Sequence, residues 1–158
     1  MKLTRRSSAA LLVPAALSLA SCGAAGSGPG APPPLAPHLR IIENVVRCDR
    51  GTHRFCGRDL VVIASGAAAR GGPTALMAAE HAALARAGWS LGGGQVAGDA
   101  SATSPGGRRY LSYGPAADDL QAIGKGNLSR PPAILASLRH EVAAHAAALS
   151  MLVEAGAG

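Results

Sequence analysis

The sequence predicts an α+β fold, in which helices pack on one face of a small, mostly antiparallel sheet to form a two-layer sandwich. Three observations predict it: β-branched and apolar runs in the first half, short alternation near the middle, and helical spacing of apolar residues in two separate segments. The chain has 158 residues with 21 Gly and 11 Pro, but only 1 Trp, 2 Tyr and 1 Phe. Aliphatic side chains must therefore build the core, and one small domain is the most that they can support.

Two strands and a helix are expected at the start of the domain. Residues 39–47 (LRIIENVVR) are rich in β-branched side chains, and residues 59–64 (DLVVIA) form a short, nearly continuous apolar run. Pro73 follows two glycines, as at many helix starts, and residues 74–87 carry apolar side chains at helical spacing. Gly88 then ends the helix.

The middle of the chain predicts a loosely connected hairpin. Residues 89–91 begin an extended piece, residues 92–107 are Gly-rich and polar, and residues 108–113 (RRYLSY) alternate as a half-buried strand does. Residues 92–97 (GGGQVA) resemble a loose phosphate-binding glycine loop, but the sequence predicts no helix after them. A hairpin loop is therefore the expected structure.

Two helices are expected at the end of the chain. The first spans residues 115–123, where Asp118 and Asp119 lie in the early turns and suit the helix dipole better than a paired-carboxylate site. The second spans residues 131–155, whose apolar side chains fall on one face at spacings of 3 and 4. His145 interrupts that face and is expected to serve the fold without binding a metal.

The segment from His140 and Glu141 to His145 resembles the zinc-binding HExxH motif, but one extra residue separates the two histidines. On an α-helix, residues i and i+5 differ by about 140°, so the two imidazoles diverge and cannot share an ion. On the earlier helix, Glu80 is expected as an inward or boundary carboxylate and His81 as a solvent-facing imidazole. The sequence therefore assigns no catalytic residue, metal ligand or cofactor.

Residues 1–22 have the order of a bacterial secretory signal, with three basic residues near the start, a short apolar stretch and then small residues. Leu19-Ala20-Ser21-Cys22 matches the lipobox of bacterial lipoproteins, in which the Cys receives diacylglycerol and further fatty acyl chains such as palmitate. The expected organisation is a signal peptide at 1–21, a Gly/Ala/Pro-rich tether at 22–38 and a single α+β domain at 39–155. The basic residues also resemble part of a twin-arginine signal, so both export routes stay open.

Cys48 and Cys56 are expected to form one structural disulfide. Export would place both in an oxidising compartment, where Cys22 would already carry lipid. A turn at Gly51 can bring the two Cα atoms within the ~4.4 to 6.8 Å that a bridge requires. The seven residues between the cysteines differ from the two-residue spacing of redox-active pairs.

Removal of residues 1–21 would lower the formal net charge from +6 to +3, because three of the 15 basic residues and none of the 9 acidic residues lie there. With so few aromatic side chains for base stacking, a nucleic-acid partner is disfavoured. Five arginines give a modest basic face that is either simply solvated or in contact with lipid headgroups or an anionic envelope polymer. They are Arg40, Arg47, Arg50, Arg54 and Arg58.

From about residue 40 to 155 the chain also resembles small lipoproteins of high-GC bacteria, through its two-Cys start, its Leu-Val-Val-Ile strand and its Asp118-bearing helix. That resemblance implies lipidation at Cys22 and no activity. We therefore expect a protein that is lipid-anchored at the extracytoplasmic face of the cell membrane and acts as a binding or interaction module, with an envelope protein among its possible partners. An extracytoplasmic enzyme is the alternative, since groups such as His81 and His140 can converge only in three dimensions.

Overall fold

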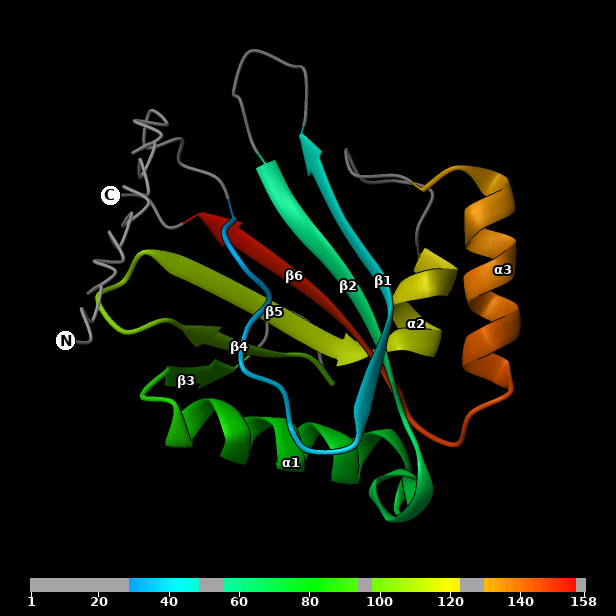
Figure 1. Ribbon diagram of the computed structural model, residues 1–158, viewed down its shortest axis with the longest axis horizontal. Coiled ribbons are helices and arrows are strands. Elements are labelled where there is room, and N and C mark those ends of the chain that lie inside the picture. The colour runs from blue at the N-terminus through cyan, green and yellow to red at the C-terminus, as the bar shows by residue number, and fades with distance from the viewer. Residues whose placement is uncertain (1–28, 49–55, 94–97, 123–129, 156–158) are drawn as a thin grey trace, which may run out of the picture.

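The computed structural model describes residues 29–48, 56–93, 98–122 and 130–155 (Figure 1). Within them, six strands form one antiparallel sheet in the order β1-β2-β6-β5-β4-β3. The strands are β1 (Leu39–Cys48), β2 (Cys56–Ala64), β3 (Ser90–Gly93), β4 (Ala100–Thr103), β5 (Arg109–Pro115) and β6 (Ala148–Ala155). The helices are the short 3-10 turn η1 (Gly66–Ala69), α1 (Gly72–Arg86), α2 (Ala116–Ala122) and α3 (Pro132–Ala143). The predicted α+β class with a small antiparallel sheet is confirmed.

Strand β2 is buried on both faces of the sheet. Leu60 and Val62 pack into the core on the side of α1, whereas Val61 and Ile63 pack into the core on the side of α2 and α3. Because side chains alternate along a strand, a continuous apolar run needs an apolar cover on each face. Helices therefore lie on both faces and not on one, so the molecule has three layers where two are expected.

The last predicted helix is shorter than expected. Helix α3 ends at Ala143, and residues 148–155 form β6 between β2 and β5 (Figure 1). Leu149 and Val153 are fully buried in that strand. The prediction of one helix over residues 131–155 is wrong beyond Ala143, because a short apolar run fits a buried strand as well as a helix.

The predicted hairpin contains an additional strand. Residues 92–107 are expected as a loop, but β4 lies within them and pairs with both β3 and β5. The small side chains of this strand carry little of the β-branched and aromatic pattern that predicts strands. Gly92 permits the close pairing, since a Cβ atom there would lie 2.8 Å from Ser101 Oγ. Residues 94–97 of the glycine-rich stretch lie outside the described residues.

Residues 29–37 fall in the expected tether but lie against the sheet on the side of α1 (Figure 1). Leu35 packs against the core on that face, and Ala36 is buried. Proline supplies no backbone N–H, so a segment this rich in proline covers the sheet without extending it as a strand. This stretch is packed as part of the folded domain and is not a free spacer.

Two arginine side chains hold the first described residues to the sheet. Arg58 on β2 donates a hydrogen bond to the carbonyl oxygen of Gly30 at 2.7 Å, and Arg109 on β5 donates to that of Ala31 at 2.8 Å. Residues 1–28, with the expected signal and Cys22, lie outside the described residues. Among the helices of the described part of the chain, none has the length and apolar character to cross a membrane.

Candidate functional site

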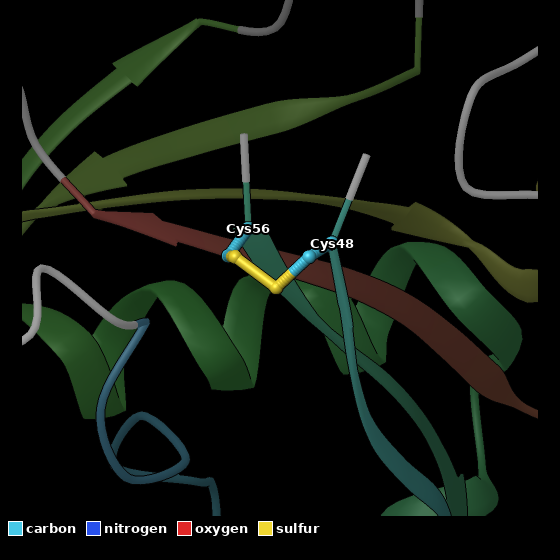
Figure 2. Close-up of a disulfide and its surroundings, with 2 residues drawn as sticks. All are labelled: Cys48 and Cys56. Atoms are coloured by element: carbon cyan, nitrogen blue, oxygen red, sulfur yellow. A yellow bond between two sulfur atoms is a disulfide. The ribbon is translucent and has the colours of Figure 1, made fainter. Parts of the chain in front are cut away.

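Cys48 and Cys56 form the predicted disulfide (Figure 2). The two residues lie opposite each other in the register of β1 and β2, with their Cα atoms 4.0 Å apart. The bridge closes the hairpin across residues 49–55, which lie outside the described residues. It joins two strand ends that are already paired, which fits a structural role.

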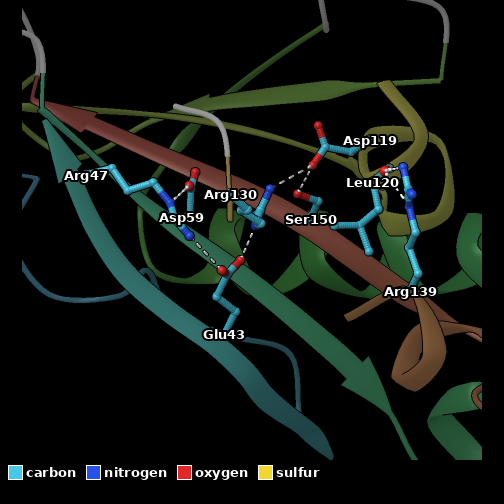
Figure 3. A network of polar contacts seen from close by, with 8 residues as sticks. All are labelled: Glu43, Arg47, Asp59, Asp119, Leu120, Arg130, Arg139 and Ser150. Atoms are coloured by element: carbon cyan, nitrogen blue, oxygen red, sulfur yellow. Dashed lines mark hydrogen bonds and ion pairs between the residues drawn. The ribbon is translucent and has the colours of Figure 1, made fainter. Parts of the chain in front are cut away.

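Buried charges link β1, β2 and the start of α3 (Figure 3). Glu43 on β1 accepts hydrogen bonds from Arg47 at 2.9 Å and from Arg130 at 2.5 Å. Arg47 also donates to Asp59 on β2 at 2.8 Å. Burial raises the pKa of Asp59, while the positive charges of Arg130 and Arg47 oppose that rise. Because the two arginines keep the buried carboxylates paired, this network has a structural role: it holds β1, β2 and the start of α3 together.

Asp118 and Asp119 do not form a paired-carboxylate site. Asp119 accepts a hydrogen bond from Ser150 on β6 at 2.5 Å and lies 3.9 Å from Arg130, so it extends the charge network (Figure 3). Asp118 is exposed on the same helix. Asp119 therefore belongs to the charge network, whereas Asp118 faces solvent.

The basic face expected from the sequence is reduced by internal contacts. Arg47 and Arg58 are committed to hydrogen bonds within the domain, whereas Arg40 stays exposed. Arg50 and Arg54 lie outside the described residues. The spacing of arginines in the sequence therefore overstates the number that reach solvent.

Glu80, His81 and Tyr113 form a buried polar cluster between α1 and β5. Glu80 is fully buried, and its Oε2 accepts a hydrogen bond from the Ala36 backbone N–H at 2.8 Å. The rings of His81 and Tyr113 meet edge to face, with centroids 5.6 Å apart. In the described part of the chain, the buried side-chain polar atoms without a partner are Glu80 Oε1, His81 Nε2 and Tyr113 Oη. The expected solvent-facing position of His81 is wrong, because its ring packs against Tyr113 and its Nε2 atom is buried.

Burial raises the pKa of Glu80 to about 7, although the hydrogen bond from Ala36 favours the charged form. Burial and the negative charge of Glu80 raise the pKa of Tyr113. A carboxyl group that titrates near neutrality is suited to general acid and base catalysis once a substrate reaches it. Here the carboxyl group is enclosed beneath Ala36 and has no contact with solvent.

A cleft of about 420 Å³ opens between α2, α3 and the start of α1. Leu120 of α2, Val142 of α3 and Ala148 of β6 contribute apolar walls, and Gln121 and Arg139 contribute polar groups. Small-molecule sites commonly have volumes of about 300 to 1,000 Å³ and combine apolar walls with a few polar groups. This cleft has both properties. Its lining comes from α2, α3 and the residues after it, β6 and Pro73 of α1, so it depends on how separate elements pack and no local motif points to it.

Two polar side chains of the cleft also form hydrogen bonds with backbone carbonyl oxygens in the last turns of helices. Arg139 donates two hydrogen bonds to the Leu120 carbonyl oxygen, from Nε at 3.0 Å and from Nη2 at 2.7 Å (Figure 3). His145 follows α3, and its Nδ1 lies 2.8 Å from the Glu141 carbonyl oxygen. Because a carbonyl only accepts, Nδ1 carries the proton. His145 thus caps α3 instead of occupying the predicted inward face of a longer helix.

The two histidines of the HExxH-like segment do not converge. His140 is exposed on the last turn of α3, and His145 lies beyond the helix end. Within the described residues, no group of three or more His, Cys, Asp or Glu side chains is placed to hold a metal ion.

Comparison with known protein families, curated proteins and solved structures finds no match to this chain. Two places in the described residues are candidate sites: the cleft between α2 and α3, where polar groups lie beside apolar walls, and the Glu80 cluster, where buried polar atoms have no partner. The cleft is open to solvent, whereas the Glu80 cluster is enclosed.

Proposed function

We propose that this chain is a lipid-anchored protein of the extracytoplasmic face of the cell membrane, and that its α+β domain is a binding module. The cleft between α2 and α3 is the proposed ligand site and the observation that carries the proposal. It is open, largely apolar and about 420 Å³ in volume, which matches the character of small-molecule sites.

The anchor is supported by the N-terminal sequence and by the disulfide. Leu19-Ala20-Ser21-Cys22 has the lipobox pattern at the end of a signal-like segment. The Cys48–Cys56 bridge adds support, because such bridges persist in oxidising compartments outside the cytoplasm.

A Cys22→Ser variant tests the anchor. The variant is expected to leave the membrane fraction or to keep its signal, because serine supplies no thiol for the lipid. Mature size and partitioning into detergent are the measurements. Ser21→Ala is the matched control, since it keeps a small residue before the cysteine and should be processed normally. A Cys22→Ser protein that matures to the same size and partitions into detergent would contradict the anchor.

An Ala143→Trp variant tests the ligand site. Ala143 lines the cleft from an exposed position on α3, so an indole ring fills the cleft without displacing a buried side chain. Small molecules extracted from the purified full-length protein are compared by mass spectrometry. We expect a compound that the wild type retains in stoichiometric amount and Ala143→Trp loses.

Ala136→Trp is the control for this experiment, because Ala136 is exposed on the same helix and does not line the cleft. It should retain the compound. Equal retention by the wild type and Ala143→Trp, or no retained compound in the wild type, would contradict the assignment of the cleft.

An extracytoplasmic enzyme is the second candidate, and the Glu80 cluster favours it. A carboxyl group with a pKa of about 7 lies with an imidazole and a phenol, but a substrate reaches them only if Ala36 moves. Chromogenic esters and phosphoesters provide the test. Turnover that Glu80→Gln abolishes and Ala143→Trp leaves unchanged would favour this enzyme over the binding module.

A further inference from the structure

The cleft has an unbalanced positive charge. Arg139 lines it, and none of the described residues that line it is acidic. No acidic side chain in the described part of the chain is within ion-pair distance of Arg139. A ligand that carries a negative charge would therefore complement the cleft.

The guanidinium group of Arg139 keeps free donors. It has five N–H groups, of which one on Nε and one on Nη2 are used by the Leu120 carbonyl oxygen. Three N–H groups on Nη1 and Nη2 remain. The two bonds to Leu120 also restrain the plane of the group, so the free edge formed by Nη1 and Nη2 is oriented before a ligand arrives.

Arg139 is the group of the cleft best suited to bind an anion, since the other polar side chains that line it are Gln121 and His145. The Nδ1 proton of His145 is donated to the backbone carbonyl oxygen of Glu141, so this nitrogen is not available to a ligand. Gln121 offers an uncharged amide. The remaining walls, including Leu120 and Val142, are apolar and favour burial of hydrocarbon.

We propose that the cleft binds a small amphipathic carboxylate, with its apolar part against Leu120 and Val142 and its carboxylate on the free edge of Arg139. A carboxylate suits this edge because it is planar, carries one charge and pairs with a guanidinium through two parallel hydrogen bonds. A phosphate monoester carries more charge than a single guanidinium neutralises. The inference rests on the proposed binding function and names its ligand class.

Octanoate and octanamide test the ligand class, since they share a hydrocarbon chain and differ in charge. The full-length lipidated protein in lipid nanodiscs is titrated calorimetrically with each probe, with empty nanodiscs as the blank. We expect octanoate to bind about tenfold more tightly than octanamide, because a carboxylate pairs with the guanidinium through two hydrogen bonds and an opposite charge, whereas the amide carries no charge. Ala143→Trp should weaken the binding of both probes.

Arg139→Gln should remove the preference for octanoate, so that the affinity for octanoate falls to about the affinity for octanamide. Octanamide binding that persists in this variant shows that the cleft survives the loss of the bonds to Leu120. Arg86→Gln is the matched control, because Arg86 is exposed on α1 and does not line the cleft; it should keep the preference.

Equal affinity of the wild type for the two probes would overturn the carboxylate inference and leave the binding module standing. The same inference fails if Arg139→Gln keeps the preference for octanoate. If neither probe binds saturably, or if Ala143→Trp does not weaken their binding, the inference is overturned and the result counts against the cleft itself as a ligand site.

Discussion

The backbone N–H of Ala36 donates a 2.8 Å hydrogen bond to the carboxylate of Glu80, which is fully buried on α1. The contact joins a proline-rich segment to the inner side of a helix that is far away in the sequence. It leaves the second carboxylate oxygen, Oε1, without a partner. Stability of this region should therefore depend on whether Glu80 is charged.

Glu80 should make the protein less stable as pH rises. Burial raises its folded-state pKa from 4.5 to about 7, so its contribution to stability is fully present below pH 4.5 and is lost as pH rises through 7. Relative to Glu80→Gln, the wild type is expected to lose about 3 kcal/mol of unfolding free energy between pH 4.5 and pH 8. Urea unfolding of both proteins across this pH range gives the difference.

Glu141→Gln is the control for this pH dependence, because Glu141 is a partly exposed carboxylate on α3. It should follow the wild-type curve. Parallel pH curves for the wild type and Glu80→Gln would show that Glu80 has an ordinary pKa in the folded protein.

Arg130→Met should be strongly destabilising. It removes a guanidinium that donates to the buried Glu43, leaving that carboxylate only Arg47 as a charged partner. Breaking a buried pair of this kind costs about 3 kcal/mol. Denaturant unfolding measures the loss, and Arg108→Met, at an exposed arginine, should change stability by less than ~0.5 kcal/mol. Similar effects of the two substitutions would mean that the network contributes little.

Loss of the disulfide should weaken the domain by a moderate amount. Replacing Cys48 and Cys56 together with serine frees a loop that spans only 8 positions, for which the chain-entropy model gives about 2.5 kcal/mol. Thermal unfolding of this double variant and the wild type measures the difference. Alkylation of either thiol in protein purified without reductant would argue against the bridge.

His145→Leu should destabilise the protein by about 1 kcal/mol, since it removes the hydrogen bond to the Glu141 carbonyl at the end of α3. His140→Leu, at an exposed position of the same helix, is the control and should have little effect. Metal analysis accompanies the unfolding measurements. A stabilised His145→Leu protein would contradict the capping role, and stoichiometric zinc lost with this substitution would contradict the expectation that His145 binds no metal.

Local sequence patterns predict several elements well. The β-branched run of β1 and the apolar run of β2 are strands, and Pro73 and Gly88 mark the two ends of α1 to within two residues. Pairing of Cys48 with Cys56 also follows from the sequence, because a short hairpin leaves the two cysteines opposite each other. These features depend on residues that are close together in the chain.

The sequence by itself determined the α+β class, the disulfide-closed hairpin and the lipobox pattern on which the anchor proposal rests. Only the tertiary structure decided that residues 148–155 are a strand, that helices cover both faces, and that Ala36 encloses Glu80. The cleft likewise forms where Leu120, Arg139 and neighbouring side chains from separate elements meet. The physical reason is that a short apolar run fits the spacing of a buried helix and of a buried strand alike. Residues 148–155 form a strand because their backbone pairs with β2 on one side and β5 on the other. The burial of Glu80 and the walls of the cleft depend on contacts between residues of different elements. The spacing of residues along the chain does not reveal such contacts.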